Sequence, residues 1–505
     1  MAWRHDWPAA ALGLAAIILI LPLWQVSLPA MPDYPAHMAG FYLIGGGASA
    51  FYRVRWAFVP NLAGELLVPP LARLVGLSAA IKLFLSAAVA MWVAGPGCIQ
   101  RALTGRIGIA PLFAAFFAMN ANYFWGFFNY YFAAGLSLMV FAAWIATAKR
   151  AGRMRTLLFA IAVTFVYFCH IFAAASLLVL IAGYETMRDG PPPARARDVL
   201  LVFLPAAFAF FALKPGGGGL DIQFDLAETM RDRFESLILY HFDAPSYWMP
   251  LAILALFLLA LGLRHARIRR EMLPALAVLG LSALLAPEWA MGGWAVHLRL
   301  PAYFCALLLA ATEVTLETEP ALAAAAAALA VMGWNANALS GAWRYYDRQY
   351  TEFRAALGHV PRNTKLLTVL DGDSIGWAAD QPYWHMAALA IIRRGAMTQL
   401  MFATPGQHVV QIIPPHDRHA ARTAEEGSPP DIGELDDLAA GNTRNDPDIR
   451  EIFPYLLRFQ CHYDMAVVIH RSGRESPAPG MLRRAYRGTF FSLYDILRDP
   501  SCAAR

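Results

Sequence analysis

Charged residues are scarce in this chain, and their scarcity indicates its broad class. Only 15% of the 505 residues are charged, whereas 58% are hydrophobic, and the mean hydropathy is +0.44. An average soluble domain carries about 25% charged residues, so the sequence predicts an integral membrane protein. The formal net charge of +5 does not indicate a nucleic-acid partner, because the arginines lie in short loops between apolar runs, where they determine topology.

Cysteine is also rare. The five cysteines form no CxxC motif and no Cys/His pattern with zinc spacing. Cys98, Cys169 and Cys305 lie in or beside apolar segments, where small core residues are expected. Cys461 and Cys502 lie in the polar C-terminal region, and they can pair if that region is exported, because oxidising compartments favour disulfides.

Several common catalytic motifs are missing. The sequence contains no GxGxxG, no Walker loop, no nucleophile elbow and no HExxH, so soluble nucleotide chemistry is not expected. A reaction on the outer face of a membrane has no access to cytoplasmic nucleotide sugars or ATP. Such a reaction needs a donor that is itself membrane-borne.

Long apolar runs dominate the first two thirds of the chain. Eleven of them lie at about 9–29, 78–97, 107–121, 126–148, 156–169, 171–185, 198–213, 247–263, 272–287, 299–316 and 320–338. Several are shorter than the ~20 residues that a full crossing usually needs. The stretch 156–185 is too long for one ordinary helix, so we predict two short helices joined by a tight turn near His170.

Arginine placement predicts the orientation of these spans. Four loops are basic, namely those around Arg101 and Arg106 and at 149–155, 188–197 and 264–270. The positive-inside rule puts all four in the cytoplasm, with the N-terminus inside and the C-terminus outside. The outer face then collects most of the unusual polar segments: Asp33, His37, the 120–129 loop, His170, the 214–246 loop, the 288–298 segment and the whole C-terminal region.

Residues 340–505 read as a separate soluble α/β domain on the outer side of the transmembrane domain 1–339. Strands are predicted at 365–370, 464–470 and 488–497 from their β-branched and aromatic content, and a helix at 383–394. The segment 416–450 is rich in charge, Pro and Gly and predicts a mobile loop. The predicted fold class is mostly α, a bundle of about 11 spans with this C-terminal domain.

Asp33 and His37 lie in the motif Asp33-Tyr-Pro-Ala-His37, directly after the first apolar run. Ionisable groups at a membrane edge are functional-site candidates by default, and the prolines at 32 and 35 stiffen the backbone around them. We predict that Asp33 is a general base and that His37 orients it or holds a substrate phosphate. The alternative is that Asp33 only caps the helix that begins near Pro35, which leaves His37 unexplained.

Further polar residues of the outer face are candidate substrate ligands. Asn122 and Asn129 belong to an aromatic turn whose rings and amides suit a sugar, although interfacial Trp and Tyr also serve as membrane anchors. His170 is either a core residue or part of the site. His297 and Arg299 precede a span, and Arg299 either snorkels or clamps a phosphate with two hydrogen bonds.

Arg53 and Arg55 follow the Asp33 motif and break the positive-inside pattern. They predict an anionic lipid headgroup or a lipid-linked phosphate as a partner. A metal site was considered in the 214–246 loop, but its carboxylates and histidine match no specific ligand spacing, so a solvated loop is preferred there. The residues concerned are Asp221, Asp225, Glu228, His241 and Asp243.

These residues together resemble the GT-C superfamily of membrane glycosyltransferases, in a bacterial member. The resemblance lies in Asp33-Tyr-Pro-Ala-His37, the aromatic turn from Asn122 to Asn129, His170 between short helices, and the segment from Trp294 to Arg299. It implies a polyprenyl-phosphate-linked sugar donor, an inverting hexosyl or pentosyl transfer, and Asp33 as the base that deprotonates the acceptor hydroxyl. Many members carry a second acidic residue in the first outer loop. In this sequence only Glu65 or a distant Asp is available for that role. We expect no cofactor and favour a metal-independent site, with a divalent cation left open.

The predicted function is therefore transfer of a sugar to an envelope lipid, polysaccharide or protein at the periplasmic face of the bacterial inner membrane. The expected partners are the lipid-linked donor and membrane lipids, and no nucleic acid. One alternative is a transporter or flippase, although the repeated halves typical of such folds are not seen. A second alternative is a non-catalytic assembly protein of an envelope polysaccharide pathway.

Overall fold

The computed structural model describes residues 7–150, 152–213, 222–237, 249–291, 293–372, 381–421, 428–440, 453–471, 475–477 and 479–503. The chain forms two compact units. The first unit consists of Met1–Val26, Phe58–Leu67 and Ile81–Ala342, and the second of Ser27–Ala57, Val68–Ala80 and Trp343–Arg505. The second unit therefore contains two N-terminal segments besides the C-terminal region, and Asp33 belongs to it.

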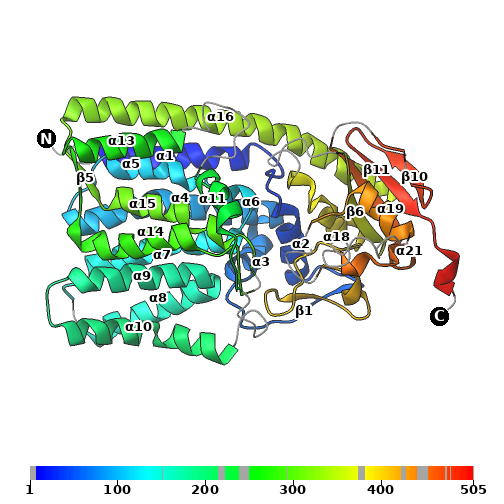
Figure 1. Ribbon diagram of the computed structural model, residues 1–505, viewed down its shortest axis with the longest axis horizontal. Coiled ribbons are helices and arrows are strands. Elements are labelled where there is room, and N and C mark those ends of the chain that lie inside the picture. The colour runs from blue at the N-terminus through cyan, green and yellow to red at the C-terminus, as the bar shows by residue number, and fades with distance from the viewer. Residues whose placement is uncertain are drawn as a thin grey trace. The chain divides into compact units, whose positions relative to one another are not determined.

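The first unit is a bundle of apolar helices (Figure 1), and each of the eleven predicted apolar runs overlaps one of them in part. The helices are α1 (Trp7–Trp24), α4 (Leu77–Thr104) from Ile81 on, α5 (Ala110–Ala114), α7 (Phe128–Ala146), α8 (Arg153–Cys169), α9 (Ile171–Met187), α10 (Pro192–Leu213), α13 (Met249–Gly262), α14 (Leu273–Leu285), α15 (Leu300–Ala310) and α16 (Thr318–Ala356) up to Ala342. Helix α9 is central, because it packs against α7, α8 and α14.

Within the described parts of the chain, five helices are long and apolar enough to cross a membrane: α1, α4, α7, α10 and the helix that begins at Thr318. The others are shorter, so the count of eleven spans stays a prediction. Helix α10 has a stripe of exposed apolar side chains, with Leu200 71%, Leu204 61%, Phe208 72% and Phe211 74% exposed. Such a stripe at helical spacing fits contact with lipid rather than with water.

The four basic loops lie at one end of the first unit, here called the basic end. Gln100, near the end of α4, donates its Nε2–H to the carbonyl oxygen of Thr312 at 2.6 Å. Thr312 opens strand β5 (Thr312–Val314), which pairs with β3 (Ala266–Ile268) in the loop before α14. The next residue after β3, Arg269, binds Glu271 at 2.6 Å and Glu313 at 3.1 Å. The segment Arg270–Met272 in turn contacts α9.

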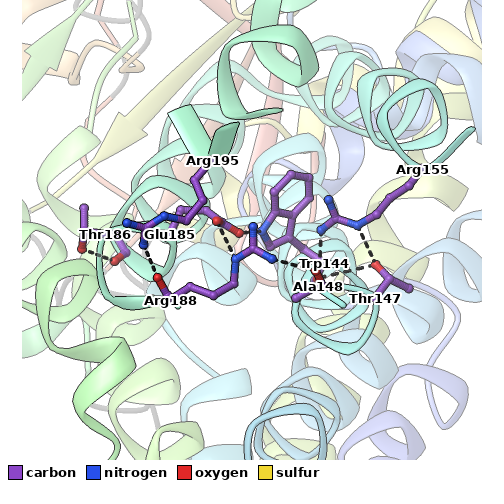
Figure 2. Close-up of polar contacts among 9 residues, drawn as sticks. Trp144, Thr147, Ala148, Arg155, Glu185, Thr186, Arg188 and Arg195 are labelled. Atoms are coloured by element: carbon purple, nitrogen blue, oxygen red, sulfur yellow. Dashed lines mark hydrogen bonds and ion pairs between the residues drawn. The ribbon is translucent and has the colours of Figure 1, made fainter. Parts of the chain in front are cut away.

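A buried carboxylate joins the helix ends in this region (Figure 2). Glu185 of α9 accepts hydrogen bonds from Trp144 Nε1 at 2.9 Å and from Arg188 Nε at 2.8 Å. Arg195 of α10 donates to the carbonyl oxygens of Glu185 and Arg188. The guanidinium of Arg155 lies 3.9 Å from the centroid of the Trp144 ring, a favourable cation–π geometry. The ends of α7, α8, α9 and α10 are thus tied together by residues of the basic loops.

The predicted pair of short helices at 156–185 is confirmed. Helix α8 ends at Cys169 and α9 begins at Ile171, with His170 in an extended conformation between them. The Nδ1 atom of His170 accepts the N–H of Phe172 at 3.2 Å and so caps α9. Because α8 starts and α9 finishes at the basic end, His170 lies at the opposite end of the bundle.

The second unit is built on a five-stranded sheet of order β10-β11-β9-β6-β7. The strands are β6 (Lys365–Asp371), β7 (Met397–Thr398), β9 (Met465–His470), β10 (Leu482–Arg487) and β11 (Phe491–Ile496). Strand β6 is parallel to β7 and β9, whereas β11 is antiparallel to β9 and β10. The predicted strands at 365–370, 464–470 and 488–497 are confirmed as β6, β9 and β11.

Two predicted segments of this unit differ from the structure in part. The helix expected at 383–394 is reduced to α18 (Leu389–Arg394) after short 3-10 turns. The segment 416–450, expected as a loop, contains α19 (Ile432–Ala440). Asp431 and Glu434 cap this helix reciprocally, at 2.7 and 2.8 Å, and Leu435 is fully buried. Residues 422–427 and 441–450 lie outside the described residues.

The N-terminal segments of the second unit form a core with its C-terminal part. Helix α2 (Tyr34–Ile44) packs against α18 (Figure 1), and β1 (Tyr52–Val54) pairs antiparallel with β8 (Val410–Ile412). The backbone ahead of α2 is fixed by Asp347, whose carboxylate accepts the N–H groups of Ser27 at 2.8 Å and Leu28 at 2.9 Å. The Asp33 motif is therefore part of the C-terminal unit's own packing.

Cys461 and Cys502, whose pairing the sequence leaves open, form a disulfide with a Cα–Cα distance of 5.4 Å. The bond closes a loop with a sequence separation of 41 residues. Cys461 lies in α21 (Phe459–His462), whose Phe459 packs into the core beside β6 and β9. The disulfide therefore holds the C-terminal segment to the sheet unit.

We predict that the double substitution Cys461→Ala and Cys502→Ala destabilises the second unit. A closed loop of this length contributes up to about 4 kcal/mol by constraining the unfolded chain. Thermal unfolding of purified protein checks this, as a lower midpoint for the second unit. Dithiothreitol should lower the wild-type midpoint to the same value and leave the double variant unchanged. A wild-type midpoint that ignores reductant would contradict the bond's contribution.

Candidate functional site

Asp33 lies at the N-cap position of α2, with Pro35 in the first turn of the helix. The backbone carbonyl of Asp33 accepts the N–H of His37 at 2.9 Å, but its carboxylate makes no capping hydrogen bond to the helix. The residue is 9% exposed. A cap alone therefore does not account for this carboxylate, because its oxygens are not engaged in the way that a capping side chain requires.

The carboxylate of Asp33 faces a histidine that the sequence analysis did not single out. The Oδ1 atom of Asp33 lies 3.7 Å from Nε2 of His385. The other ring nitrogen, Nδ1, lies 2.9 Å from the carbonyl oxygen of Leu400. A carbonyl only accepts, so Nδ1 carries a ring proton. Burial lowers the pKa of His385 to about 4 against the opposing effect of the Leu400 bond, so the ring is neutral at pH 7.

His37 approaches the same place through one aromatic ring. The His37 ring lies 5.0 Å from the ring of Phe402 and 5.8 Å from that of Phe41. Phe402 also contacts the ring of His385 at 4.9 Å. We call Asp33, His37, His385 and Phe402 the Asp33 cluster. Helix α2 supplies its first two members, and the segments before and after α18 supply the others.

Arg53 and Arg55 lie on the surface of the second unit. Both side chains are exposed on or beside β1. Arg53 donates a long hydrogen bond of 3.4 Å to Gln411 of the neighbouring strand β8. The two arginines are thus held on a short ribbon with their charges toward solvent, whereas Asp33 and His385 are buried.

In the first unit, Arg299 is enclosed by aromatic rings. Its guanidinium carbon lies 5.3 Å from the ring centroid of Phe127, 5.6 Å from that of Tyr130 and 5.1 Å from that of Phe172. The hydroxyl of Tyr130 donates to the backbone carbonyl of Arg299 at 2.5 Å. These distances fall within the range of cation–π attraction, so the rings hold the charge in a fixed place.

His170 joins the same group. Its ring lies 5.2 Å from that of Tyr130, edge to face. Burial, and then the positive charge of Arg299, hold the pKa of His170 well below its ordinary value, so this imidazole is neutral. We call Arg299, Tyr130, His170, Phe127 and Phe172 the Arg299 cluster. The structure thus brings together His170, the predicted aromatic turn and Arg299.

Asn129 is engaged with a buried glutamate. Its Oδ1 accepts the N–H of Gly64 at 2.6 Å, and its Nδ2 donates to Asn61 and to Glu65, each at 2.9 Å. Burial raises the pKa of Glu65 to about 7, with the hydrogen bonds from its own backbone and from Asn129 opposing. The hydrogen bonds of the Asn129 amide thus hold the start of α3 (Ala63–Val75) in place.

Asn122 and His297 are also buried and engaged inside the first unit. The Nδ2 group of Asn122 donates to Asn120 at 2.9 Å and to the carbonyl of Leu298 at 3.1 Å. The Nε2 atom of His297 lies 3.7 Å from Asp232. The Nδ2 group of Asn122 therefore helps to position the backbone that leads into Arg299.

Among the described residues, no group of three or more His, Cys, Asp and Glu side chains could hold a metal ion. Asp221, His241 and Asp243 of the 214–246 loop lie outside the described residues. A cavity of about 760 Å³ opens at the basic end, beside Arg101, Arg106 and Glu313. It lies at the end of the bundle opposite to the Arg299 cluster.

No protein-family model matches the sequence, and no curated protein matches it. Two solved structures are similar over 97% of this chain. One is the arabinofuranosyltransferase AftD from mycobacteria, with 14% identity and a TM-score of 0.47. The other is ArnT from Cupriavidus metallidurans bound to undecaprenyl phosphate, with 11% identity and a TM-score of 0.39. The chain covers 40% of the length of AftD and 98% of that of ArnT.

The raised pKa of Glu65 predicts a pH-dependent stability. The folded protein keeps a proton on Glu65 that the unfolded chain releases above pH 4.5, so this contribution is lost as the pH rises to about 7. The loss is about 3 kcal/mol for a shift of this size. We expect Glu65→Gln to match wild-type stability near pH 4.5 and to exceed it at pH 8. Thermal unfolding at both pH values measures the difference.

Glu317→Gln is the matched control for this experiment. Glu317 is exposed at the basic end, so the same change of charge should leave the difference between the two pH values as it is in the wild type. Equal pH dependence in Glu65→Gln and wild-type protein would show that Glu65 is ionised in the folded state.

Proposed function

We propose that the chain is a membrane glycosyltransferase that moves a sugar from a polyprenyl-phosphate carrier to an envelope acceptor, with inversion. Asp33 is the general base. The observation that carries this role is the surroundings of its carboxylate, which is nearly buried, does not cap α2, and lies 3.7 Å from the imidazole of His385.

The proposed reaction transfers one proton and exchanges one bond at the anomeric carbon of the sugar. Asp33 takes the proton of the acceptor hydroxyl, and the acceptor oxygen forms a bond to the anomeric carbon of the sugar. The bond from that carbon to the phosphate oxygen breaks, and the electron pair leaves with the polyprenyl phosphate. His37, which contacts the same Phe402 ring as His385, orients the base or the phosphate.

Arg299 is proposed as the group that binds the donor phosphate. Its cluster is buried, and a charge in such surroundings attracts an anion more strongly than it would in water. The three rings fix its position, and His170 stays neutral beside it. We propose a supporting role for three further residues, because their described contacts are with other residues of this protein: Asn122, Asn129 and His297. The exposed Arg53 and Arg55 are proposed to meet anionic lipid headgroups.

The proposed location is the bacterial inner membrane, with the second unit in the periplasm. Gathering of the basic loops at one end of the bundle supports this orientation, because such loops stay in the cytoplasm. The disulfide between Cys461 and Cys502 supports an oxidising compartment for the second unit. The eleven-span count and the acceptor on the periplasmic face belong to the same proposal.

The first test is Asp33→Asn, which keeps the shape of the side chain and removes its basicity. Loss of a general base lowers the rate about 10²–10⁴-fold, so a strain carrying the variant should accumulate the polyprenyl-phosphate sugar. Mass spectrometry of lipid extracts detects that species and identifies the donor. Asp417→Asn, at an exposed carboxylate of the same unit, should not cause accumulation. Normal lipids and normal polysaccharide in the Asp33→Asn strain would instead favour an assembly protein.

The second test is Arg299→Lys, measured with the donor identified in the first. Lysine keeps the charge but loses the paired hydrogen bonds to a phosphate, so we expect the KM for the donor to rise about tenfold. Arg155→Lys is the matched control, because Arg155 also lies over two rings, of Trp144 and Phe159. An unchanged donor KM in Arg299→Lys, with the control also unchanged, would exclude the phosphate role.

A further inference from the structure

We propose that the cavity at the basic end of the first unit binds an anionic phospholipid by its phosphate group. The cavity has a volume of about 760 Å³, within the range of about 300–1,000 Å³ that ligand sites occupy. It is formed by the first turn of α1, the last turn of α4 with the loop that follows, and the connection from β5 to α16 (Figure 1). All of these segments belong to the first unit. The proposal does not depend on the transferase reaction, because the cavity and the Arg299 cluster lie at opposite ends of the bundle.

Two guanidinium groups line the cavity with their charges uncompensated. Arg101, in the last turn of α4, and Arg106, in the loop after it, are exposed. Neither side chain makes a hydrogen bond or an ion pair with a residue that the structure describes. Two carboxylates also line the cavity, but Glu313 is paired with Arg269 at 3.1 Å, and only the exposed Glu317 is left to oppose the two arginines. The excess of positive charge favours an anion as the ligand.

Hydrogen bonds within the protein fix the backbone that carries Arg106. The side chain of Gln100, which is 2% exposed, donates to the carbonyl of Thr312 at 2.6 Å and accepts the N–H of Gly108 at 2.5 Å. The hydroxyl oxygen of Thr104 accepts the N–H of Arg106 at 3.3 Å and lies 2.8 Å from its carbonyl oxygen. A loop held in this way loses little freedom when its arginine binds an anion, and this preorganisation raises the affinity.

The two arginines are presented in a way that suits a phosphate group. Gly105 has a φ of 81°, a left-handed conformation that lets the chain turn directly after α4. Arg101 and Arg106 therefore come from either side of one turn and line the same cavity. The planar guanidinium donates two parallel hydrogen bonds to two oxygens of a phosphate, which an ammonium group does not do.

Apolar side chains form another part of the lining and favour a lipid over a free anion. They include Trp7, Ile107, Ile109 and Leu316. An inorganic anion would lose hydration beside these side chains without burying any apolar surface of its own. A phospholipid brings both a phosphate and an apolar remainder, and tryptophan is enriched where hydrocarbon meets water. A phospholipid of the adjoining leaflet therefore matches the charged and the apolar parts of the lining.

The proposed orientation of the protein determines which leaflet supplies this lipid. The basic end faces the cytoplasm in that orientation, and basic residues beside the cytoplasmic ends of spans attract anionic headgroups. Three helices that are long and apolar enough to cross a membrane, α1, α4 and α16, have an end at this cavity. A bound lipid would therefore hold the ends of these three helices together and stabilise the folded bundle.

The test measures how lipids raise the thermal unfolding midpoint of the purified full-length protein in detergent. Short-chain phosphatidylglycerol is the anionic probe, short-chain phosphatidylcholine the zwitterionic one, and inorganic phosphate represents the anion alone. We expect phosphatidylglycerol to raise the midpoint at a lower concentration than either of the others. The double substitution Arg101→Gln and Arg106→Gln should weaken the binding of phosphatidylglycerol about tenfold.

The matched control is the double substitution Arg267→Gln and Arg270→Gln. It removes two exposed charges from another loop of the basic end, and neither residue lines the cavity, so the affinity for phosphatidylglycerol should stay at the wild-type value. An equal loss of affinity in both double variants would show attraction by the general charge of this end and overturn the site. Binding of phosphatidylcholine or of inorganic phosphate as tight as that of phosphatidylglycerol would also overturn the proposal.

A second variant tests the cavity with its charges intact and serves if the arginine variant fails to fold. Ala9, exposed in the first turn of α1, lines the cavity, and Ala9→Trp fills part of its volume. We expect this variant to bind phosphatidylglycerol more weakly than the wild type, at unchanged net charge. Wild-type affinity in Ala9→Trp would contradict the placement of the lipid in the cavity.

Discussion

The central constraint on this protein is that polar side chains placed in apolar surroundings need partners inside the protein. Burying an uncompensated carboxylate or guanidinium costs several kcal/mol, so each such group recruits a partner from another element. Glu185 accepts hydrogen bonds from Trp144 and Arg188 and so joins the ends of the helices at the basic end. The carboxylate of Asp347 accepts hydrogen bonds from the N–H groups of Ser27 and Leu28 and fixes the chain ahead of α2. The positions of the candidate site residues follow from this same requirement.

The constraint also separates two buried carboxylates that look alike in the sequence. Glu65 is bound by Asn129, and burial raises its pKa to about 7, so its described contacts are those of a structural group. Asp33 faces a neutral ring nitrogen at a distance longer than a hydrogen bond. We propose Asp33 rather than Glu65 as the base, because the described hydrogen bonds of Asn129 to Glu65 and Gly64 hold the start of α3.

Much of the local structure could be predicted, and the reasons are physical. The division of 156–185 at His170 followed from length, because one helix of thirty apolar residues is unusual for a span. The strands β6, β9 and β11 followed from runs of β-branched and aromatic residues. Helix α19 was missed because the surrounding charge, Pro and Gly masked a short amphipathic turn. His385 was missed because Trp384-His385 looks like part of one helical pattern, and its partner is remote in sequence.

The sequence by itself determined the membrane character, the gathering of arginine in four loops, and the placing of Asp33, His170 and Arg299 beside apolar runs. These properties depend on local composition, since transfer into an apolar phase is nearly additive along the chain. Only the tertiary structure decided that Asp33 belongs to the unit built mainly from the C-terminal region, that His385 is its neighbour, and that Phe127, Tyr130 and Phe172 enclose Arg299. Such contacts join residues far apart in the chain, and they are selected by packing and by the pairing of buried polar groups, neither of which a local pattern contains.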